Sequence, residues 1–240
     1  MSIVTYIYRC RLELHDSLYF ATREIGRLYE TEPILHNYAL CYALGFVDSD
    51  RYGTRVETDN EYRYFCRHQV PQYEAHLSQL NHRGIYVTPA RSIHHTAVLQ
   101  TWKYADNRYH VEMQKTQKNI PSFGRAKEIA PESEFECFVI SETELPFPKW
   151  IRLGKWMSKA AVNAEPLPKP TYRENRSVTV PYPLNPLDVM FSHRVMSFDT
   201  INMPPVSLIR NVKLQGNVYE VQLEKETIAL PANMTYRFSS

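Results

Sequence analysis

The sequence predicts an α+β protein in which helices cover one face of an antiparallel sheet. Segments with strand-like alternation flank two helix-like segments, so the first two thirds read strand, helices, strand, hairpin, strand. The composition agrees, because 17 tyrosines and 16 prolines against 7 glycines favour strands joined by ordered, irregular connections. This order of elements favours a ferredoxin-like (RRM-like) sheet, followed by a smaller β-rich C-terminal part.

The first elements follow from periodicity. Residues 3–16, "IVTYIYRCRLELHD", alternate apolar and polar side chains and predict a strand. A helix is expected from Pro33 to Gly45, because proline suits the first helical position and glycine the C-cap. A second helix is expected from Pro71 and ends at Gly84.

The later elements alternate strands with long connections. We expect a short strand over 84–90, a hairpin within 96–113, a loop over 114–133 and a strand over 134–141. Prolines crowd residues 163–175, which indicates a boundary between a domain at 1–165 and a β-rich region at 166–240. In that region, "VSLIRNVKLQGNVYEVQLE" predicts a hairpin turning at "QGN", and "TIALP" a last strand.

Composition also narrows the class of protein. The four cysteines are widely spaced, which indicates buried thiols in a reducing compartment, with two disulfides as the alternative. No signal peptide and no run of ~18 apolar residues occur, so we expect a cytoplasmic protein that does not enter a membrane. The sequence lacks the common phosphate-loop, dinucleotide and zinc motifs, so no cofactor or metal is expected.

Charge is unevenly distributed although the net charge is only +2. Residues 75–105, 113–127 and 145–164 contain no Asp or Glu, whereas residues 128–144 contain six Glu and no Lys or Arg. If the basic segments meet in space, they form a groove that follows nucleic-acid phosphates, with aromatic side chains stacking on bases. The alternative is that these cations are scattered over a solvated surface.

The stretch "PKWIRLGKWMSKAAV", residues 148–162, is the densest of these segments. It places Lys149, Arg152, Lys155 and Lys159 around Gly154 and between two tryptophans. Helical spacing would align most of these cations on one face. The nearby prolines and Gly154 argue against a helix, so a strand, or a strand with a bulge, is expected.

Catalytic motifs are weak. His94 and His95, with Arg91 and Lys103 nearby, could supply the base and the cation of a metal-independent ribonuclease. The alternative is that they are loop histidines in contact with solvent or RNA. The dipeptide His15–Asp16 fits a strand-end turn better than a metal site.

Three long motifs carry a resemblance to a known family. The segments "RLELHDSLYFATREIGRLYETEPILHNYALCYALG", "GIYVTPA" and "WIRLGKWMSKA", with "IALPANMTY" near the end, resemble the Csc-one subunit of the type I-D CRISPR effector complex. That subunit belongs to the Cas-five group of RNA-binding RAMP proteins. The resemblance implies an RRM-like domain, a projecting thumb, and a smaller β-rich part.

The resemblance also implies a function. Such subunits cap the 5′ handle of the crRNA at one end of the Cascade filament. They contact a Cas-seven-type backbone subunit and the large PAM-reading subunit, possibly near target DNA. Most do not cut RNA, so a non-catalytic antiviral defence subunit is expected. Two alternatives are an endoribonuclease that processes precursor crRNA, and a module that binds only protein.

The same resemblance indicates the RNA-binding residues. The glycine-bearing basic stretch assigns Arg152, Lys155, Trp156 and Lys159 to the handle, and Lys149 less firmly. The loop around 113–127 is the thumb candidate, with Lys115, Lys118, Arg125 and Lys127. The stretch has a single glycine where many relatives have several, so side chains must contribute more of the phosphate contacts.

Overall fold

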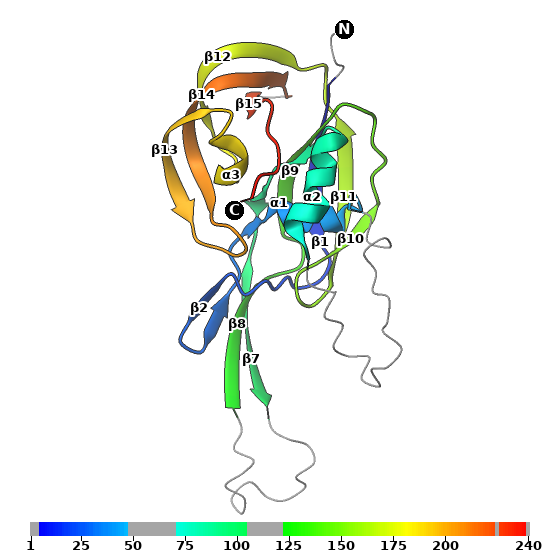
Figure 1. Ribbon diagram of the computed structural model, residues 1–240. Helices are drawn as coiled ribbons and strands as arrows, with labels where there is room; N and C mark the ends of the chain where they lie inside the picture. The colour runs from blue at the N-terminus through cyan, green and yellow to red at the C-terminus, as the bar shows by residue number, and fades with distance from the viewer. Residues whose placement is uncertain (1–4, 48–70, 105–121, 224–225, 239–240) are drawn as a thin grey trace, which may run out of the picture.

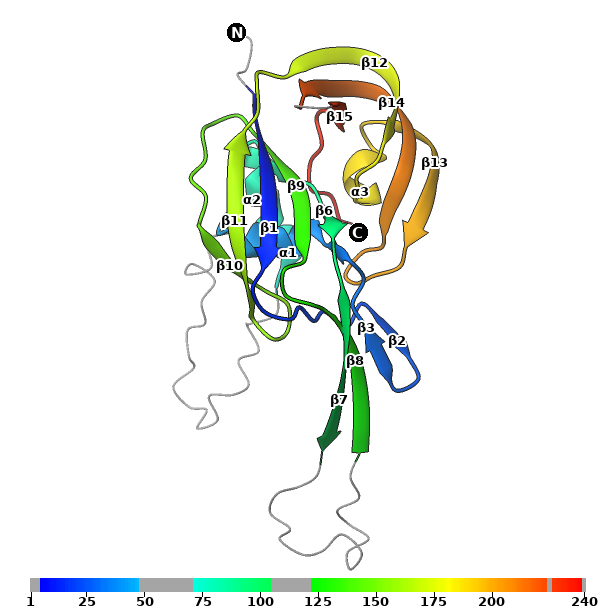
Figure 2. The same cartoon turned by 180° about the vertical axis from the view of Figure 1, so that it is seen from behind.

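The protein is mostly β in a computed structural model that describes residues 5–47, 71–104, 122–223 and 226–238. In this part of the chain the strands form three sheets: a central sheet, a projecting ribbon and a curled C-terminal sheet (Figure 1). Nearly all strand pairs are antiparallel, as predicted. Figure 2 shows the central sheet from the side opposite its helices.

The central sheet has the order β10-β11-β1-β9-β6-β4, and β5 also pairs with β9. Strand β1 lies in its middle, where Cys10 is opposite Cys137 of β9 and Leu12 is opposite Val162 of β11. Its strands are β1 (Tyr6–Leu14), β4 (Ile34–Leu35), β5 (Ile85–Val87), β6 (Ala90–His94), β9 (Glu134–Ser141), β10 (Trp150–Leu153) and β11 (Ser158–Pro166).

Helices α1 (Asn37–Ala43) and α2 (Tyr73–His82) lie against one face of this sheet (Figures 1 and 2). The alternation of β1 turns Cys10, Leu12 and Leu14 into the core. Helix α1 starts later than predicted, because His36 accepts a hydrogen bond from the Tyr38 N–H and caps it. The predicted stop of α2 near Gly84 is confirmed, where φ is +59°.

The ferredoxin-like arrangement is not confirmed. Strands β1 and β5 are parallel on either side of β9, and α1 and α2 lie in the crossover between them. Strands β9 and β11 are likewise parallel on either side of β1. Their connection, residues 142–149 with β10, contains no helix, although a ferredoxin-like fold requires one there.

The projecting ribbon, called the thumb from here on, corrects the prediction of a loop over 114–133 (Figures 1 and 2). Strand β7 (Ala97–Tyr104) pairs with β8 (Ser122–Ile129), so the second half of the loop expected over 114–133 contains a strand. The short hairpin β2 (Arg23–Ile25) and β3 (Leu28–Glu30) extends this sheet through a parallel β3–β8 pair. Residues 105–121, including the expected turn, lie outside the described residues.

The C-terminal sheet has the order β12-β14-β13, with β15 also on β14. The predicted hairpin at "QGN" is wrong, because β14 runs straight through it. Gly216 serves packing instead: a Cβ there would come within 2.3 Å of the His193 ring. The elements are β12 (Thr171–Val180), α3 (Pro186–Val189), β13 (Arg194–Ile201), β14 (Leu208–Gln222) and β15 (Thr227–Pro231).

The C-terminal segment returns to the central sheet. The Tyr236 hydroxyl accepts a hydrogen bond from the Val87 N–H at 2.8 Å and lies 3.0 Å from Cys41 Sγ. The side-chain amide of Asn81 accepts a hydrogen bond from the Tyr236 N–H at 2.9 Å and donates one to the Tyr236 carbonyl at 3.0 Å. One hydrophobic core therefore runs from the helices into the C-terminal sheet.

A buried carboxylate also joins the two regions. Asp188 of α3 accepts hydrogen bonds from Asn37 Nδ2, the Tyr86 hydroxyl and the Arg237 N–H, at 2.9–3.1 Å. Burial raises the pKa of Asp188 to about 7, although these three donors act to lower it.

The remaining predictions concern cysteines and membranes. Cys10, Cys41 and Cys137 are free and buried, as predicted. Cys66 lies outside the described residues. Among the helices that the structure describes, none is long and apolar enough to cross a bilayer.

Candidate nucleic-acid interface

The basic stretch forms the hairpin β10–β11, which confirms the predicted strand. Arg152 is opposite Lys159, and Leu153 is opposite Ser158. Ile151 and Leu153 are buried, whereas Trp150 and Arg152 are exposed, as expected for alternating residues of a strand with one covered face. The hairpin therefore presents Trp150, Arg152 and Lys159 on the face of the central sheet opposite its helices.

The turn of this hairpin depends on Gly154. Its φ is +71°, and a Cβ would lie only 2.6 Å from the Tyr19 carbonyl oxygen. The next residue, Lys155, donates its backbone N–H to the same oxygen at 2.8 Å. The single glycine thus allows the turn to pack against the segment that follows β1.

Trp156 at the turn is held in a defined position. Its ring stacks on Tyr19 at 5.1 Å and an interplanar angle of 22°, and its Nε1 donates to Glu128 Oε1 at 3.2 Å. The ammonium of Lys155 lies 5.9 Å from the Tyr19 ring centroid, at the limit of a cation–π contact. Trp156 nevertheless stays 57% exposed, so one face of a fixed indole is open to a ligand.

A second cluster surrounds Trp150. The Lys159 ammonium lies 3.8 Å from the Trp150 ring centroid, and His15 meets that ring edge-on at 4.8 Å. The guanidinium of Arg152 donates to the Met157 carbonyl and lies 3.7 Å from Asp16. Both members of this ion pair are more than half exposed, so water screens it and it competes weakly with an incoming phosphate.

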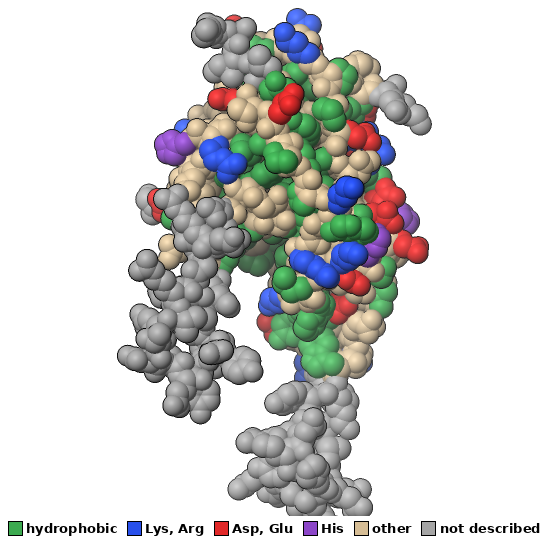
Figure 3. Space-filling model, turned by 90° about the vertical axis from the view of Figure 1, so that its right-hand side faces the viewer, with side chains coloured by type: hydrophobic (Ala, Val, Ile, Leu, Met, Phe, Trp, Pro, Cys, Tyr) green, Lys and Arg blue, Asp and Glu red, His purple; other side chains and the backbone are tan. Residues whose placement is uncertain are grey.

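An open cleft of about 830 Å³ runs beside the edge strand β10. The hairpin lines it with Trp150, Arg152 and Lys159, and the helical layer lines it with Tyr42 and Tyr73. Figure 3 shows Lys and Arg side chains gathered beside hydrophobic ones on the side of the molecule that carries β10 and β11. Lys149 precedes this strand and is exposed.

The thumb cations lie apart from the hairpin. Lys115 and Lys118 fall outside the described residues. On β8, Glu128 faces Trp156, so alternation turns Lys127 and Arg125 to the opposite side of the ribbon. The described residues therefore do not bring Arg125 and Lys127 into one groove with Trp156.

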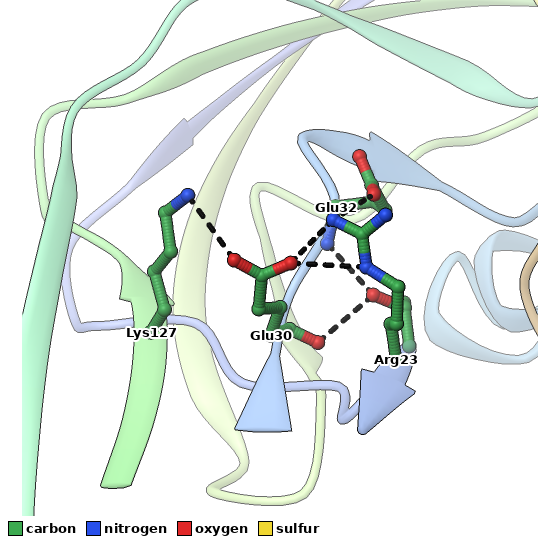
Figure 4. A network of polar contacts seen from close by, with 5 residues as sticks. Arg23, Glu30, Glu32 and Lys127 are labelled. Carbon is green, nitrogen blue, oxygen red and sulfur yellow. Dashed lines mark hydrogen bonds and ion pairs between the residues drawn. The ribbon is translucent and has the colours of Figure 1, made fainter. Parts of the chain in front are cut away.

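Lys127 is already paired on that side. Its ammonium lies 3.5 Å from Glu30, which also bonds the Arg23 guanidinium (Figure 4). Arg23 in turn lies 3.3 Å from Glu32. The network stabilises the contact between the β2–β3 hairpin and the thumb, and it neutralises part of the positive charge.

The histidines of the nuclease alternative are at the base of the thumb. His94 and His95 are both exposed, and His95 Nδ1 lies 2.9 Å from the Ser92 hydroxyl. Arg91 pairs with the buried Glu136 at 3.0 Å and lies 4.3 Å from the Tyr182 ring centroid. Arg91 is therefore committed to the contact with the C-terminal region. No group of three or more His, Cys, Asp or Glu in the described part of the chain could hold a metal ion.

Sequence reasoning missed the partners that fix these side chains. Tyr19, Asp16 and Glu128 each lie in a different segment from the hairpin they contact. Burial raises the pKa of Tyr19, and nearby Tyr29, Glu128 and Glu24 raise it further, so its hydroxyl stays neutral. No periodicity in the sequence signals such contacts across elements.

Comparison with known proteins bears on the family. No curated protein matches the chain. One similar solved structure is a chain of the type III-B Cmr-beta complex bound to cognate target RNA and AMPPnP, determined by cryo-EM; the match covers 86% of each chain at 9% identity and a TM-score of 0.39. The family model described as type I-D CRISPR-associated protein Cas5/Csc1 matches residues 5–239. Because that match spans nearly the whole sequence, the chain belongs to the type I-D Cas5/Csc1 family.

Proposed function

We propose that this protein binds and caps the 5′ handle of the crRNA as a non-catalytic subunit of a type I-D Cascade complex. The observation that carries the proposal is the β10–β11 hairpin, where exposed cations and indoles lie side by side. Single-stranded nucleic acid is bound by this combination, since cations hold the backbone and aromatic rings stack on bases.

The hairpin divides these two tasks. Arg152, Lys155 and Lys159 contact phosphates, and Trp156 stacks on a base with its free face. The exposed pair between Arg152 and Asp16 opens readily, because an exposed ion pair is worth only about 0–1 kcal/mol. The close contact of Gly154 with Tyr19 leaves little room for phosphate at the backbone, so side chains make most contacts.

Other parts of the surface remain for protein partners. In this proposal the subunit works in the cytoplasm, where it contacts a Cas-seven-type backbone subunit and the large PAM-reading subunit near the target DNA. Family membership supports an assembly of this kind.

The hairpin assignment is tested by removing its charge. Arg152, Lys155 and Lys159 are changed to Ala together, and the variant is co-expressed with its neighbouring subunits. We expect a folded protein whose purified complex lacks crRNA, or which fails to join the complex. A matched control changes three exposed cations of the C-terminal sheet, Arg194, Arg210 and Lys213, and should retain crRNA. Normal crRNA content in the first variant would refute the assignment.

The endoribonuclease alternative has its own test. The folded protein is incubated alone with repeat RNA in EDTA. Discrete fragments that disappear in the His94→Ala/His95→Ala variant would establish cleavage. We expect intact RNA, since Arg91 is engaged by Glu136 and Tyr182.

A further inference from the structure

The thumb carries a second aromatic stack that lies outside the basic hairpin. Trp102 of β7 packs on Tyr29 of β3 with ring centroids 6.3 Å apart and an interplanar angle of 19°. Trp102 is 37% exposed. Its ring also lies over Gly124, where an added Cβ would come within 2.4 Å of Trp102 Cε2. Glycine at this position of β8 therefore leaves room for the indole to lie flat on the ribbon.

Both stacks lie on the same side of the thumb. Gly124, beneath Trp102, and Glu128, which accepts from Trp156, are four residues apart on β8 and so point to one side. Tyr29 is opposite Ala126 of β8, so it lies on the same side and between the levels of Gly124 and Glu128. The rings thus form one row in the order Trp156, Tyr19, Tyr29, Trp102, here called the aromatic row.

The spacing shows how the row would be used. The β8 residues that the two indoles contact, Gly124 and Glu128, are four residues apart, about 13 Å along the strand, so the indoles meet the ribbon at two separate points. Each indole stacks on a tyrosine and remains partly exposed, Trp156 at 57% and Trp102 at 37%. The row therefore offers two separate stacking positions, one beside the hairpin and one on the thumb.

The charges along the row select bases rather than phosphates. Glu24 of β2 is opposite Tyr29, and Glu128 accepts a hydrogen bond from Trp156, so two carboxylates lie on this side; Lys155 lies at its hairpin end. Carboxylates repel phosphate, whereas the rings accept the uncharged faces of nucleobases. A strand whose phosphates are held at the hairpin can lay its following bases on the row.

We propose that the aromatic row is a base-stacking surface for single-stranded RNA, which leads the strand from the β10–β11 hairpin onto the Trp102 side of the thumb. The proposal rests on the proposed function, because it requires RNA at the hairpin. It adds a binding residue on the thumb, Trp102, and it assigns the RNA to the side of the ribbon opposite Arg125 and Lys127.

The test places a fluorescent base at each position in turn. Complexes are assembled with crRNA that carries 2-aminopurine, whose fluorescence is quenched by stacking, at single handle or adjoining guide nucleotides. We expect quenching at one nucleotide that is relieved by Trp156→Leu and at another that is relieved by Trp102→Leu, several-fold in each case. Trp102→Phe and Trp156→Phe should keep most of the quenching, since they keep a ring.

A second variant tests the position of the Trp102 indole without removing the tryptophan. Gly124→Ala keeps the indole but displaces it, because the new Cβ would overlap the Trp102 ring. It should relieve quenching at the Trp102 nucleotide alone. The control Phe191→Leu removes an aromatic ring that is 67% exposed in the C-terminal region, and should change nothing.

The outcomes separate the two proposals. Wild-type complexes without crRNA would overturn the proposed function. Complexes that keep crRNA but show no nucleotide whose quenching depends on Trp102 or Trp156 would overturn the stacking surface alone. Loss of a protein subunit in the Trp→Leu variants, with quenching unchanged, would assign the row to a protein contact and would equally overturn it.

Discussion

At the scale of single residues, Gly154 determines whether the hairpin turn can form. Its positive φ and the 2.6 Å approach to the Tyr19 carbonyl oxygen make Gly154→Ala strained in two ways. A non-glycine residue at such a φ costs about 1–2 kcal/mol, and the backbone oxygen cannot move aside as a flexible side chain would. We expect the free energy of unfolding in urea to fall by at least about 2 kcal/mol.

Gly26 provides the matched control. Its φ is +61°, but no atom lies within 4 Å of an added Cβ. Gly26→Ala should therefore show only the backbone penalty, and the difference between the two variants measures the clash. Equal losses would contradict the role assigned to the Tyr19 contact.

Single residues also show how far sequence reasoning reaches. The spacing of Lys149, Arg152, Lys155 and Lys159 in a strand-like segment located an exposed basic hairpin. The same reasoning placed Arg125 and Lys127 in that groove, because it could not know that β8 pairs with β3 and turns Lys127 toward Glu30. Charge along a chain does not reveal which side of a sheet a residue occupies.

At the scale of elements, the hairpin should give RNA binding a characteristic salt dependence. Each phosphate neutralised on a single strand contributes about 0.7 to the slope of log K against log salt. Lys155→Gln should therefore reduce the slope by about 0.7. Trp156→Leu should weaken binding but leave the slope unchanged. Affinities measured at several salt concentrations check both; an unchanged slope in Lys155→Gln would exclude a phosphate contact.

Helices and strands were predicted best where a local sequence pattern has a single structural cause. The alternation of β1 corresponds directly to burial, and the glycine expected to end α2 does so at Gly84. The "QGN" turn failed because glycine has two uses: it permits turns, and it makes room for a neighbour such as the His193 ring. A sequence alone does not distinguish these uses.

At the scale of the whole molecule, His36 makes the free energy of unfolding decrease as the pH falls. Burial lowers the pKa of His36 to about 4, and its neutral ring bridges α1 to the Val206 carbonyl at 3.1 Å. The folded pKa is below the unfolded value of about 6.5, so this stability is present above pH 6.5 and is lost as pH falls toward 4. Urea unfolding at pH 7 and pH 5 should show a decrease that is smaller in His36→Asn, which keeps a capping side chain.

Asp188 acts in the opposite direction. Its pKa of about 7 in the folded protein exceeds the ordinary value of 3.8 for an aspartic acid, so the protonated acid is the form that folding favours. Its contribution to stability is greatest below about pH 4 and declines as pH rises to 7, by about 1.4 kcal/mol per unit of pKa difference. Asp188→Asn should be less stable overall but should lack this decline between pH 4 and 7, as measured by urea unfolding.

The organisation of the whole chain was predicted less completely. The proline-rich residues 163–175 do contain the connection between the central and C-terminal sheets. A continuous hydrophobic core joins the two regions on either side of this predicted boundary. Asp188 and Tyr236 strengthen the junction, because they form hydrogen bonds with α1 and β5. Such long-range contacts leave no local pattern, so only the three-dimensional structure reveals them.

The return of Tyr236 to the central sheet has a consequence for synthesis. Its hydroxyl meets Cys41, a residue that is 195 positions earlier in the sequence. At about 5–20 residues per second, a ribosome needs on the order of 10–40 s to make the chain between these two residues. During that time the amide side chain of Asn81 and the backbone N–H of Val87 lack their final partner. The nascent protein is therefore incomplete, and exposed to chaperones and proteases, until the segment that follows β15 has been translated.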